Sequence, residues 1–539
     1  MRLGVYDDSL LLLGARLSGA GWLPYRDFYS HYGPLGFAAL APLLKWLVNP
    51  GVTLRVAQSA GLIGLVVLLG LAARRSGARL GSLALPAAAA ALSPAFAVPA
   101  FLGYGFAAGA AALFLCGEAE AGPPPRSTWP WTVAAGALLA ACALTRPAFA
   151  AYVAAAIVAV ELAVFGRDSI RRLLVGLAAA SAVAGILWVA LFRHIDLREA
   201  LVAVTIAPAR LMARRHVDPG LAREDLVLTL PIAAAIAAGP LLWAFAAPSR
   251  AGRRLWLWIA VCAIALGAAA PLLLRHPVSG LPPTALAGVA FAASVLLAWL
   301  SRDALGSSPS LRAAAVLGAS AAAFGHYFWS RPDVQHLYPL LGLSAVSAAF
   351  AWERFGGVLR AVTVAALLLA FFPLDPGPGF PGGNLFRGGI ASIRENAARP
   401  GARLKTIWPA GEVPSPPVEA VRLADRLADR GSRFVAYGNA QSWTPGDPVY
   451  LFLLSSRLPY TKWFQYDPGL QSSPPIQEAM IRELEASGSR SAVVWRSESY
   501  YFDPPPPGTA VRSPFDAYVD RVYANVVGRF GNYEVRTRD

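Results

Sequence analysis

Residues 148–192 read AFAAYVAAAIVAVELAVFGRDSIRRLLVGLAAASAVAGILWVALF, and this stretch decides the fold class. Its two apolar runs, 148–165 and 171–192, meet at three arginines between positions 167 and 172. Each run is close to the roughly 20 apolar residues that a helix needs to cross a bilayer. Short loops rich in arginine are typical of the cytoplasmic side of a membrane protein. The stretch therefore predicts two transmembrane helices joined by a short cytoplasmic loop.

The composition of the whole chain fits this prediction. Hydrophobic residues make up 56% of the 539 residues and charged residues only 15%, which is too few to cover the surfaces of several soluble domains. The net charge of +15 is not a nucleic-acid signal, because the basic residues form short clusters between apolar runs. The three cysteines show no paired spacing, so neither a disulfide framework nor a zinc site is expected.

Apolar runs of similar length recur along most of the chain. The candidate spans are 53–73, 80–98, 101–116, 129–145, 148–165, 171–192, 225–247, 255–274, 282–300, 311–328, 337–352 and 357–373. Only helices satisfy the backbone of runs this long in lipid. We therefore predict a mainly α polytopic bundle of about twelve spans. If the first span runs inward, the chain starts on the outer side, and a thirteenth helix is expected before Asp7.

This orientation places the short basic loops inside and the long mixed segments outside. The outer side then holds Asp7, Asp8, the segment 193–224, the loops HPVSGLPP and SRPDVQH, and the tail after Pro373. All six histidines fall on or near the same face: His31, His194, His216, His276, His326 and His336. The outer face is therefore where we expect the chemistry.

The first outer segment begins with paired acids and continues as SLLLLGARLSGAG, which predicts a short helix capped by Asp8 or Ser9 and ended by Gly19 or Gly21. The next residues include Trp22, Tyr25, Phe28, Tyr29 and Tyr32, which we expect to form an aromatic belt at the lipid headgroups. GPLGFAALAPLLKWL is too short to span and is placed in the interface. Asp7 and Asp8 have two interpretations: capping and solvation, or a catalytic carboxylate whose basicity is tuned by desolvation and a like-charged neighbour.

The paired acids, the Gly-Ala-Arg of the short helix, PYRDF and HYGPLGF resemble the first outer loop of the glycosyltransferase C superfamily. These polytopic enzymes use polyprenyl-phosphate-linked sugars, and the chain is most similar to their protein O-mannosyltransferase-like and aminoarabinose-transferase-like bacterial members. LTRPAF (144–149), SRPDVQHLYP (330–339) and a mixed C-terminal domain are also similar. The resemblance implies that Asp7 is the catalytic carboxylate, with Asp8 beside it. One departure is that PAFLGYGFAAGAAALF lacks the second-loop acid of many members, so the use of a divalent metal stays open and no metal ligand is named.

A lipid-phosphate leaving group requires positive charge, and arginine matches phosphate oxygens well. The candidate phosphate-binding residues are Arg146, Arg210, Arg214, Arg215 and Arg331. The alternative for any one of them is headgroup binding or snorkelling without chemistry. The candidate substrate-binding residues are Tyr25, Arg26, His31, Tyr32, His216, His276, Asp333 and His336. The alternative for the SRPDVQH group is a turn with an Arg–Asp pair.

The tail begins where FPLDPGPGFPGGN (372–384) ends the helical pattern. Three amphipathic helices and three strands alternate after it, which predicts a small α/β domain. The predicted helices are PVEAVRLADRLADRG, PIQEAMIRELEASG and FDAYVDRVYANVV, and the predicted strands are RFVAY, SAVVW and FGNYEVRT. The aromatic segment 439–469 either grips a substrate or packs as a loop. The predicted division is a first extracytoplasmic loop at 1–52, a transmembrane domain at 53–373 and an extracytoplasmic α/β domain at 374–539.

The sequence thus predicts a plasma-membrane (inner-membrane) enzyme with its C-terminal domain outside. It would transfer a hexose or pentose from a lipid-phosphate donor to a lipid, glycan or protein acceptor of the envelope, with inversion. Its expected partners are the donor, an unknown acceptor and membrane lipids, without nucleic acid. The alternative is a non-catalytic or transporter/flippase-type protein. Transporters carry ionisable residues near the middle of the membrane, whereas Glu161, the nearest candidate, lies close to an inner helix end.

Overall fold

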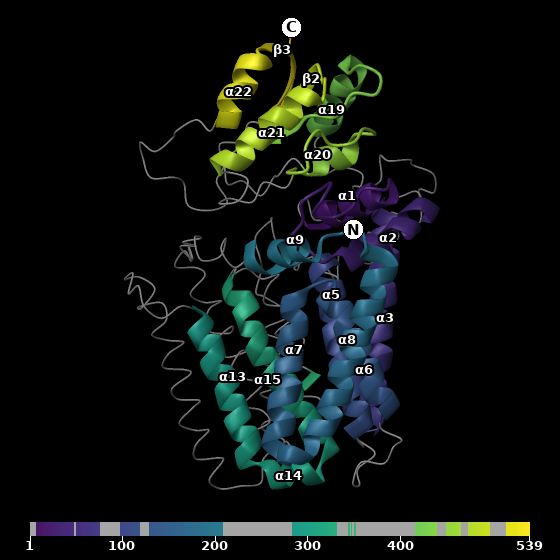
Figure 1. Ribbon diagram of the computed structural model, residues 1–539, viewed down its shortest axis with the longest axis vertical. Helices are drawn as coiled ribbons and strands as arrows, with labels where there is room; N and C mark the ends of the chain where they lie inside the picture. The colour runs from purple at the N-terminus through teal and green to yellow at the C-terminus, as the bar shows by residue number, and fades with distance from the viewer. Residues whose placement is uncertain are drawn as a thin grey trace.

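The structure, a computed structural model, describes residues 7–47, 50–75, 98–118, 129–207, 283–330, 343–344, 346–347, 350–351, 415–438, 449–464, 473–495 and 514–538. These residues form a long helical bundle, a layer of short helices at one end of it, and a small α/β unit beyond that layer (Figure 1). We call this end of the bundle the α1 end and the opposite one the α14 end.

The bundle helices run side by side (Figure 1). They are α3 (Pro50–Arg75), α5 (Val98–Glu118), α6 (Trp129–Ala143), α7 (Pro147–Phe165), α8 (Ile170–Phe192), α13 (Pro283–Leu300) and α15 (Pro309–Ser330). Each coincides with a predicted apolar run. The predicted spans 225–247, 255–274 and 357–373, and most of 80–98 and 337–352, lie outside the described residues, so the count of about twelve stays a prediction.

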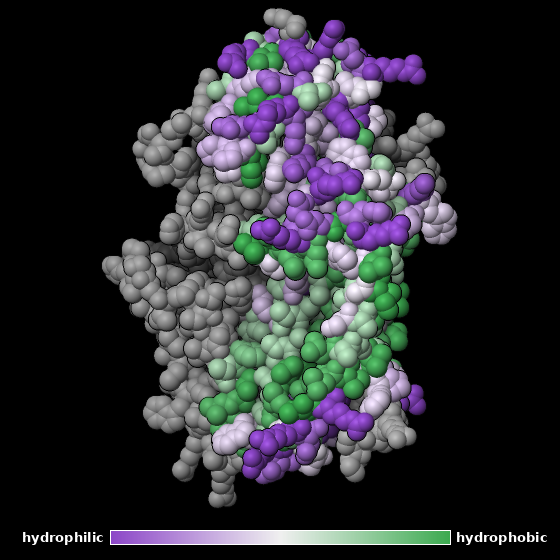
Figure 2. All heavy atoms as spheres, viewed as in Figure 1, coloured by the Kyte–Doolittle hydropathy of each residue, from purple (hydrophilic) through white to green (hydrophobic). Residues whose placement is uncertain are grey.

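One stretch of the described chain, Pro147–Phe192, is long and apolar enough to cross a membrane: it has 46 residues and contains an 18-residue window with a mean hydropathy of 2.3. It comprises α7, the turn η4 (Gly166–Ser169) and α8, and its length is about twice the 20 residues that one crossing needs. Gly166 ends α7 with φ +58°, and α8 then runs back to the α1 end (Figure 1). Apolar side chains on α8, such as Leu177 and Ile186, remain exposed. Figure 2 shows a hydrophobic band along the bundle.

Small residues allow the bundle helices to approach closely. A Cβ on Gly136 of α6 would lie 2.5 Å from the carbonyl oxygen of Gly176 on α8. Alanines fill much of the buried core between α5, α7 and α15, where Phe149 also packs 4.7 Å from Phe324, measured between ring centroids. Close contact through small residues is typical of helices that associate without a hydrophobic driving force.

The layer at the α1 end contains α1 (Asp7–Gly19), α2 (Pro34–Leu47), α9 (Leu197–Leu201) and the π-helical turn η5 (Val202–Ile206). The predicted cap at Asp8 or Ser9 is wrong, because α1 already begins at Asp7 and includes both residues. Its predicted end at Gly19 is confirmed. With 14 residues, α2 is about 21 Å long, which is shorter than the roughly 30 Å of hydrocarbon in a bilayer.

The C-terminal α/β unit comprises α19 (Ser415–Leu427), β1 (Ala436–Gly438), α20 (Val449–Leu454), α21 (Pro474–Ala486), β2 (Ser491–Trp495), α22 (Pro514–Val522), β3 (Asn525–Phe530) and β4 (Tyr533–Thr537). The strand order is β1-β2-β4-β3, with β1 parallel to β2 and the other neighbours antiparallel. An α/β unit is therefore present, whereas the exact three-part division of the chain stays a prediction.

Two elements of this unit differ from the sequence predictions. The predicted third helix ends at Val522, and its last residues form β3 instead. The cause is a hairpin: Gly531 has φ +56° and, with Asn532, joins β3 to β4 in a two-residue turn. The helix α20 lies inside the aromatic segment 439–469, for which no helix was predicted, and its residues Val449–Leu453 are buried.

The apolar character of α1 follows from its place between the bundle and the α/β unit. Leu10, Leu11, Leu12, Leu13 and Leu17 are all at most 1% exposed. They belong to one core with residues of α2, α19, α20 and the sheet. A helix that is apolar on all sides is buried on all sides, and here the residues that cover it come from both ends of the chain.

Candidate functional site at the α1 end

The turn after α1 is held in one conformation by its own residues. Tyr25 has φ +69°, the one positive φ outside glycine among the described residues. Its amide donates to the carbonyl of Phe28 (2.6 Å), and its hydroxyl donates to the carbonyl of Tyr32 (2.7 Å). Burial raises the pKa of Tyr25 well above its ordinary value, so the phenol stays a neutral donor. Left-handed backbone costs roughly 1–3 kcal/mol in such a residue and is common at binding sites.

This turn contacts the connection between α6 and α7. The amide of Gly33 donates to the carbonyl of Thr145 (2.9 Å), and that of Leu35 donates to the carbonyl of Leu144 (3.1 Å). A Cβ at position 33 would lie 2.1 Å from the Leu144 oxygen, which only glycine avoids. HYGPLGF and LTRPAF, which are more than a hundred residues apart in the sequence, are therefore direct neighbours in the structure.

Arg146 occupies the position that begins α7. Its guanidinium carbon lies 4.6 Å from the ring centroid of Tyr32 and 5.5 Å from that of Phe149. Rings hold a guanidinium by its face, whereas phosphate oxygens bind the N–H groups at its edge. The N-terminal end of α7 adds the positive end of a helix dipole at the same place. The surroundings of Arg146 are therefore compatible with an anionic ligand.

Two other predicted substrate residues lie on the same turn. The ring of His31 is 4.1 Å from that of Tyr32 between centroids. Arg26 forms an exposed ion pair with its neighbour Asp27 (2.8 Å). Asp27 also accepts a hydrogen bond from the amide of Leu23 (2.8 Å), and the Arg26 hydrogen bond is the main cause that lowers the pKa of Asp27. The turn thus brings Tyr25, His31 and Tyr32 together, whereas Arg26 pairs with Asp27 at the surface.

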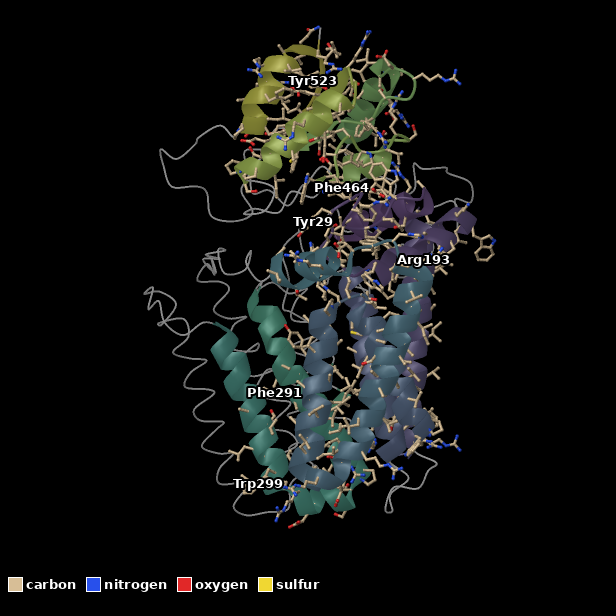
Figure 3. All side chains as sticks on the ribbon, in the orientation of Figure 1. Tyr29, Arg193, Phe291, Trp299, Phe464 and Tyr523 are labelled. Atoms are coloured by element: carbon tan, nitrogen blue, oxygen red, sulfur yellow. The ribbon has the colours of Figure 1, made fainter. Side chains whose placement is uncertain are left out.

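The predicted headgroup belt is wrong for four of its five aromatic residues, because Tyr25, Phe28, Tyr29 and Tyr32 are at most 7% exposed. Their rings pack inside the protein, and Figure 3 shows Tyr29 and Phe464 between the bundle and the α/β unit. Phe28 stacks on Phe464 (6.2 Å) and Tyr29 on Trp463 (5.4 Å). For residues 449–464, this supports the packed-loop interpretation of the aromatic segment.

Solved structures with a similar fold identify the architecture of this chain. Neither a protein-family model nor a curated protein matches the sequence. ArnT from Cupriavidus metallidurans, in its apo state, aligns with 99% of this chain and 94% of its own, at 14% identity and a TM-score of 0.51. The chain has the glycosyltransferase C fold.

Two structures from Archaeoglobus fulgidus are more distant. An oligosaccharyltransferase tethered to an acceptor peptide aligns over 92% of this chain at 13% identity, with a TM-score of 0.47. AglB in complex with an inhibitory peptide and a dolichol-phosphate aligns at 14% identity, with a TM-score of 0.41. The chain spans 65% and 66% of the lengths of these two archaeal chains. The fold and the apolar stretch Pro147–Phe192 support a membrane location.

Several predicted site residues of this glycosyltransferase C fold stay predictions. Asp7 and Asp8 are the first two residues of α1, and nothing further is described of them. Outside the described residues lie Arg210, Arg214, Arg215, His216, His276, Arg331, Asp333 and His336. Among the residues that the structure describes, no three His, Cys, Asp or Glu side chains gather to hold a metal ion.

Three ionisable residues of the bundle, Glu161, Arg172 and Arg312, lie at its α14 end. Glu161 of α7 forms an ion pair with Arg172 of α8 (3.6 Å). Arg172 also donates to the carbonyl of Phe114 (2.8 Å), and Arg312 donates to the carbonyls of Leu305 and Gly306 (2.9 and 3.0 Å). These contacts join helices to one another, and the transporter alternative stays a hypothesis.

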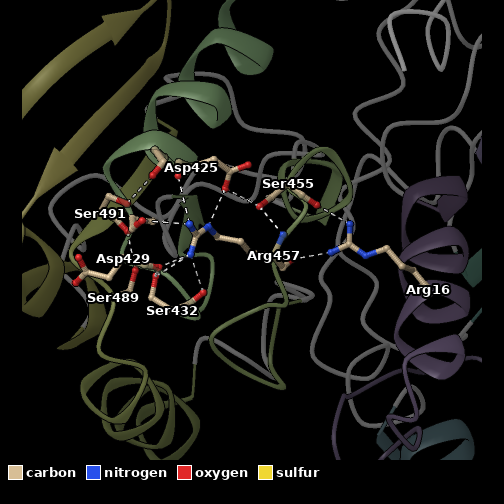
Figure 4. A network of polar contacts seen from close by, with 10 residues as sticks. Arg16, Asp425, Asp429, Ser432, Ser455, Arg457, Ser489 and Ser491 are labelled. Atoms are coloured by element: carbon tan, nitrogen blue, oxygen red, sulfur yellow. Dashed lines mark hydrogen bonds and ion pairs between the residues drawn. The ribbon is translucent and has the colours of Figure 1, made fainter. Parts of the chain in front are cut away.

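Arg16 and Arg457 were missed by the sequence reasoning. They form the polar network of Figure 4, which joins α1 to the α/β unit. The available signal was the arginine of the Gly-Ala-Arg motif inside an otherwise apolar helix, because a charge there requires partners. No signal identified those partners, since they are backbone carbonyls more than 400 residues away.

Proposed function

We propose that this chain is a membrane glycosyltransferase acting at the extracytoplasmic face. It moves a sugar from a polyprenyl-phosphate-linked donor to an envelope acceptor, with inversion at the anomeric carbon. The observation that carries the proposal is the direct contact between the turn 25–33 and Leu144–Arg146, at the end of the bundle where α1 begins. The glycosyltransferase C fold supports the reaction class, and the resemblance of the first loop supports the lipid-phosphate donor.

In this mechanism a carboxylate at the start of α1, Asp7 with Asp8 beside it, accepts the proton of the acceptor hydroxyl. The acceptor oxygen forms a bond to the anomeric carbon as the bond from that carbon to the phosphate oxygen breaks. The electron pair leaves on the polyprenyl phosphate, and Arg146 stabilises the negative charge that develops there. One preorganised donor of this kind contributes about 3–4 kcal/mol to the barrier reduction in other enzymes.

The remaining outer residues complete the proposed site. Tyr32 and Phe149 hold the guanidinium of Arg146 in place, and His31 lies next to Tyr32 at the site margin. We assign Arg210, Arg214, Arg215 and Arg331 to the lipid phosphate, and His216, His276, Asp333 and His336 to the substrates, from their sequence positions. The C-terminal unit, proposed to begin at residue 374, would then cover the site from outside in a multi-pass plasma-membrane protein.

The test measures transfer by purified protein in proteoliposomes. The probes are polyprenyl phosphates that carry radiolabelled glucose, mannose or arabinose, with an envelope extract as the acceptor, and the readout is radiolabel in acceptor together with free polyprenyl phosphate. The double variant Asp7→Asn, Asp8→Asn is expected to lose at least about 100-fold in rate, as is typical when a general base is removed. Asp303→Asn is the control, because Asp303 lies at the α14 end in an exposed pair with Arg302. Full activity of the double variant would overturn the mechanism.

A further inference from the structure

Arg16 connects two parts of the chain that are 437 to 441 residues apart. From α1, its guanidinium donates to the carbonyls of Ser455 and Arg457 (both 2.6 Å) and, more weakly, to that of Leu453 (3.4 Å). These carbonyls lie at the end of α20 and just after it. Arginine suits such a site because its donors form a rigid fork that can meet several acceptors at once.

The segment that Arg16 holds is itself fixed to the α/β unit. The guanidinium of Arg457 donates to the carbonyls of Asp429 (2.6 Å), Ala428 (3.1 Å) and Ser432 (3.1 Å), which follow the end of α19. Ser455 donates to the carboxylate of Asp425 (2.9 Å). Figure 4 shows the two arginines in series, so that α1 is joined through them to α19.

The remaining described contacts of α1 with the unit are apolar. Leucines of α1 share a core with α20 and the sheet, but apolar contact has no direction and allows a helix to rotate or slide. Hydrogen bonds from a charged group to fixed carbonyls resist both movements. Burial lowers the pKa of the Arg16 guanidinium and the nearby Asp425 opposes this, so the group keeps its charge.

We propose that Arg16 is a positioning residue for the transfer reaction. It fixes the rotation and register of α1 against the C-terminal unit, and thereby the place of Asp7 and Asp8 nine and eight residues before it on the same helix. The inference rests on the proposed function. In this proposal the C-terminal unit contributes to the reaction by holding α1, the helix that carries the proposed base.

The test compares Arg16→Gln and Arg16→Lys with the unchanged protein in the same proteoliposome assay. Arg16→Gln is expected to lower kcat by roughly 10- to 100-fold, as misplaced catalytic groups do, while KM for the lipid-linked sugar changes less than about twofold. The pH profile of kcat is expected to shift, because the proposed base changes its surroundings. Arg16→Lys keeps the positive charge but loses the planar guanidinium, so its kcat is expected to lie between those of Arg16→Gln and the unchanged protein.

Arg433→Gln is the matched control. Arg433 also bridges the unit and the first loop, but through the ring of Trp22 at 4.9 Å.

Hydrogen–deuterium exchange provides a readout that does not need activity. Residues 7–19 are expected to exchange faster in both Arg16 variants, with β2 unchanged, and to stay protected in Arg433→Gln. If Arg16→Lys and Arg16→Gln keep the kcat, pH profile and exchange of the unchanged protein, the positioning role of Arg16 is wrong and the proposed function is unaffected. If the double variant at Asp7 and Asp8 is fully active, the proposed function fails instead.

Discussion

The two ends of the bundle use the same residue type in different ways. At the α14 end, Arg172 and Arg312 meet carbonyls and a carboxylate of neighbouring helices within the bundle. At the α1 end, Arg146 lies against the rings of Tyr32 and Phe149, beside a turn held in a strained conformation. The first arrangement fixes helices to one another, whereas the second holds a cation against aromatic rings next to the turn that follows α1. Arginine content alone does not identify a site; the groups around the guanidinium do.

The largest expected effect concerns stability at the α14 end. Glu161→Gln removes the carboxylate that faces Arg172 and leaves a buried charge without its counter-ion. Breaking a buried ion pair in this way costs about 3–5 kcal/mol, which would be measured by SDS-induced unfolding in detergent micelles. Asp303→Asn at the same end breaks only an exposed pair with Arg302 and is expected to leave the unfolding curve unchanged. Equal curves for the two variants would contradict the structural role of Glu161.

The next effect concerns rate at the α1 end. Arg146→Gln is expected to lower kcat about 100- to 1,000-fold, the range found when one charge-stabilising donor is removed. Arg146→Lys keeps the charge without the planar fork and is expected to recover part of this loss. At the other end, Arg75→Gln removes a guanidinium that lies over Trp131 (4.5 Å) and should leave kcat per folded molecule unaltered. Similar losses in the Arg146 and Arg75 variants would remove the distinction between the ends.

A third variant tests the contact between the turn and the α6–α7 connection. Gly33→Ala places a methyl group against the carbonyl of Leu144 and is expected to cost about 1–3 kcal/mol, as overpacking does. Its kcat should fall as well, since Tyr32 and Arg146 are moved apart. Gly185→Ala in α8 is the control, because its Cβ would meet no atom within 4 Å. A transition midpoint for Gly33→Ala that equals the control would show that the two motifs do not need this close approach.

The smallest effect concerns pH. The folded pKa of Asp27 lies below its unfolded value of about 3.9, chiefly because of the Arg26 hydrogen bond. Its contribution to stability is therefore present above the unfolded pKa and is lost as the pH falls through the folded pKa. We expect Asp27→Asn to melt slightly lower than the unchanged protein at pH 7, with the difference vanishing in strong acid. A difference that grows on acidification would reverse the sign assigned to this pair.

Much of the fold was predictable from the sequence because lipid imposes a simple rule on it. Runs of about 20 apolar residues have one stable form in a bilayer, and α3, α5, α6, α7, α8, α13 and α15 coincide with such runs. The hairpin of β3 and β4 was missed, although Gly531–Asn532 is a turn signal, because the preceding residues continue a helical pattern up to Val522.

The site was predictable only in part. Arg146 and the turn residues were named from motifs, and the structure brings those motifs together. The aromatic residues were misassigned because a tyrosine at the lipid headgroups and a buried tyrosine look the same in the sequence. The structure distinguishes them, since residues 449–464 cover these rings. Arg16 was missed because its partners are carbonyls, which every residue has and no sequence pattern marks.

The position of α1 also has a consequence for how the protein is made. Its leucines are covered by α20 and by strands that leave the ribosome more than 400 residues later. During synthesis the apolar surface of this helix therefore stays uncovered by these residues until they have been made. The core around α1 is thus completed only after the C-terminal α/β unit has been synthesised.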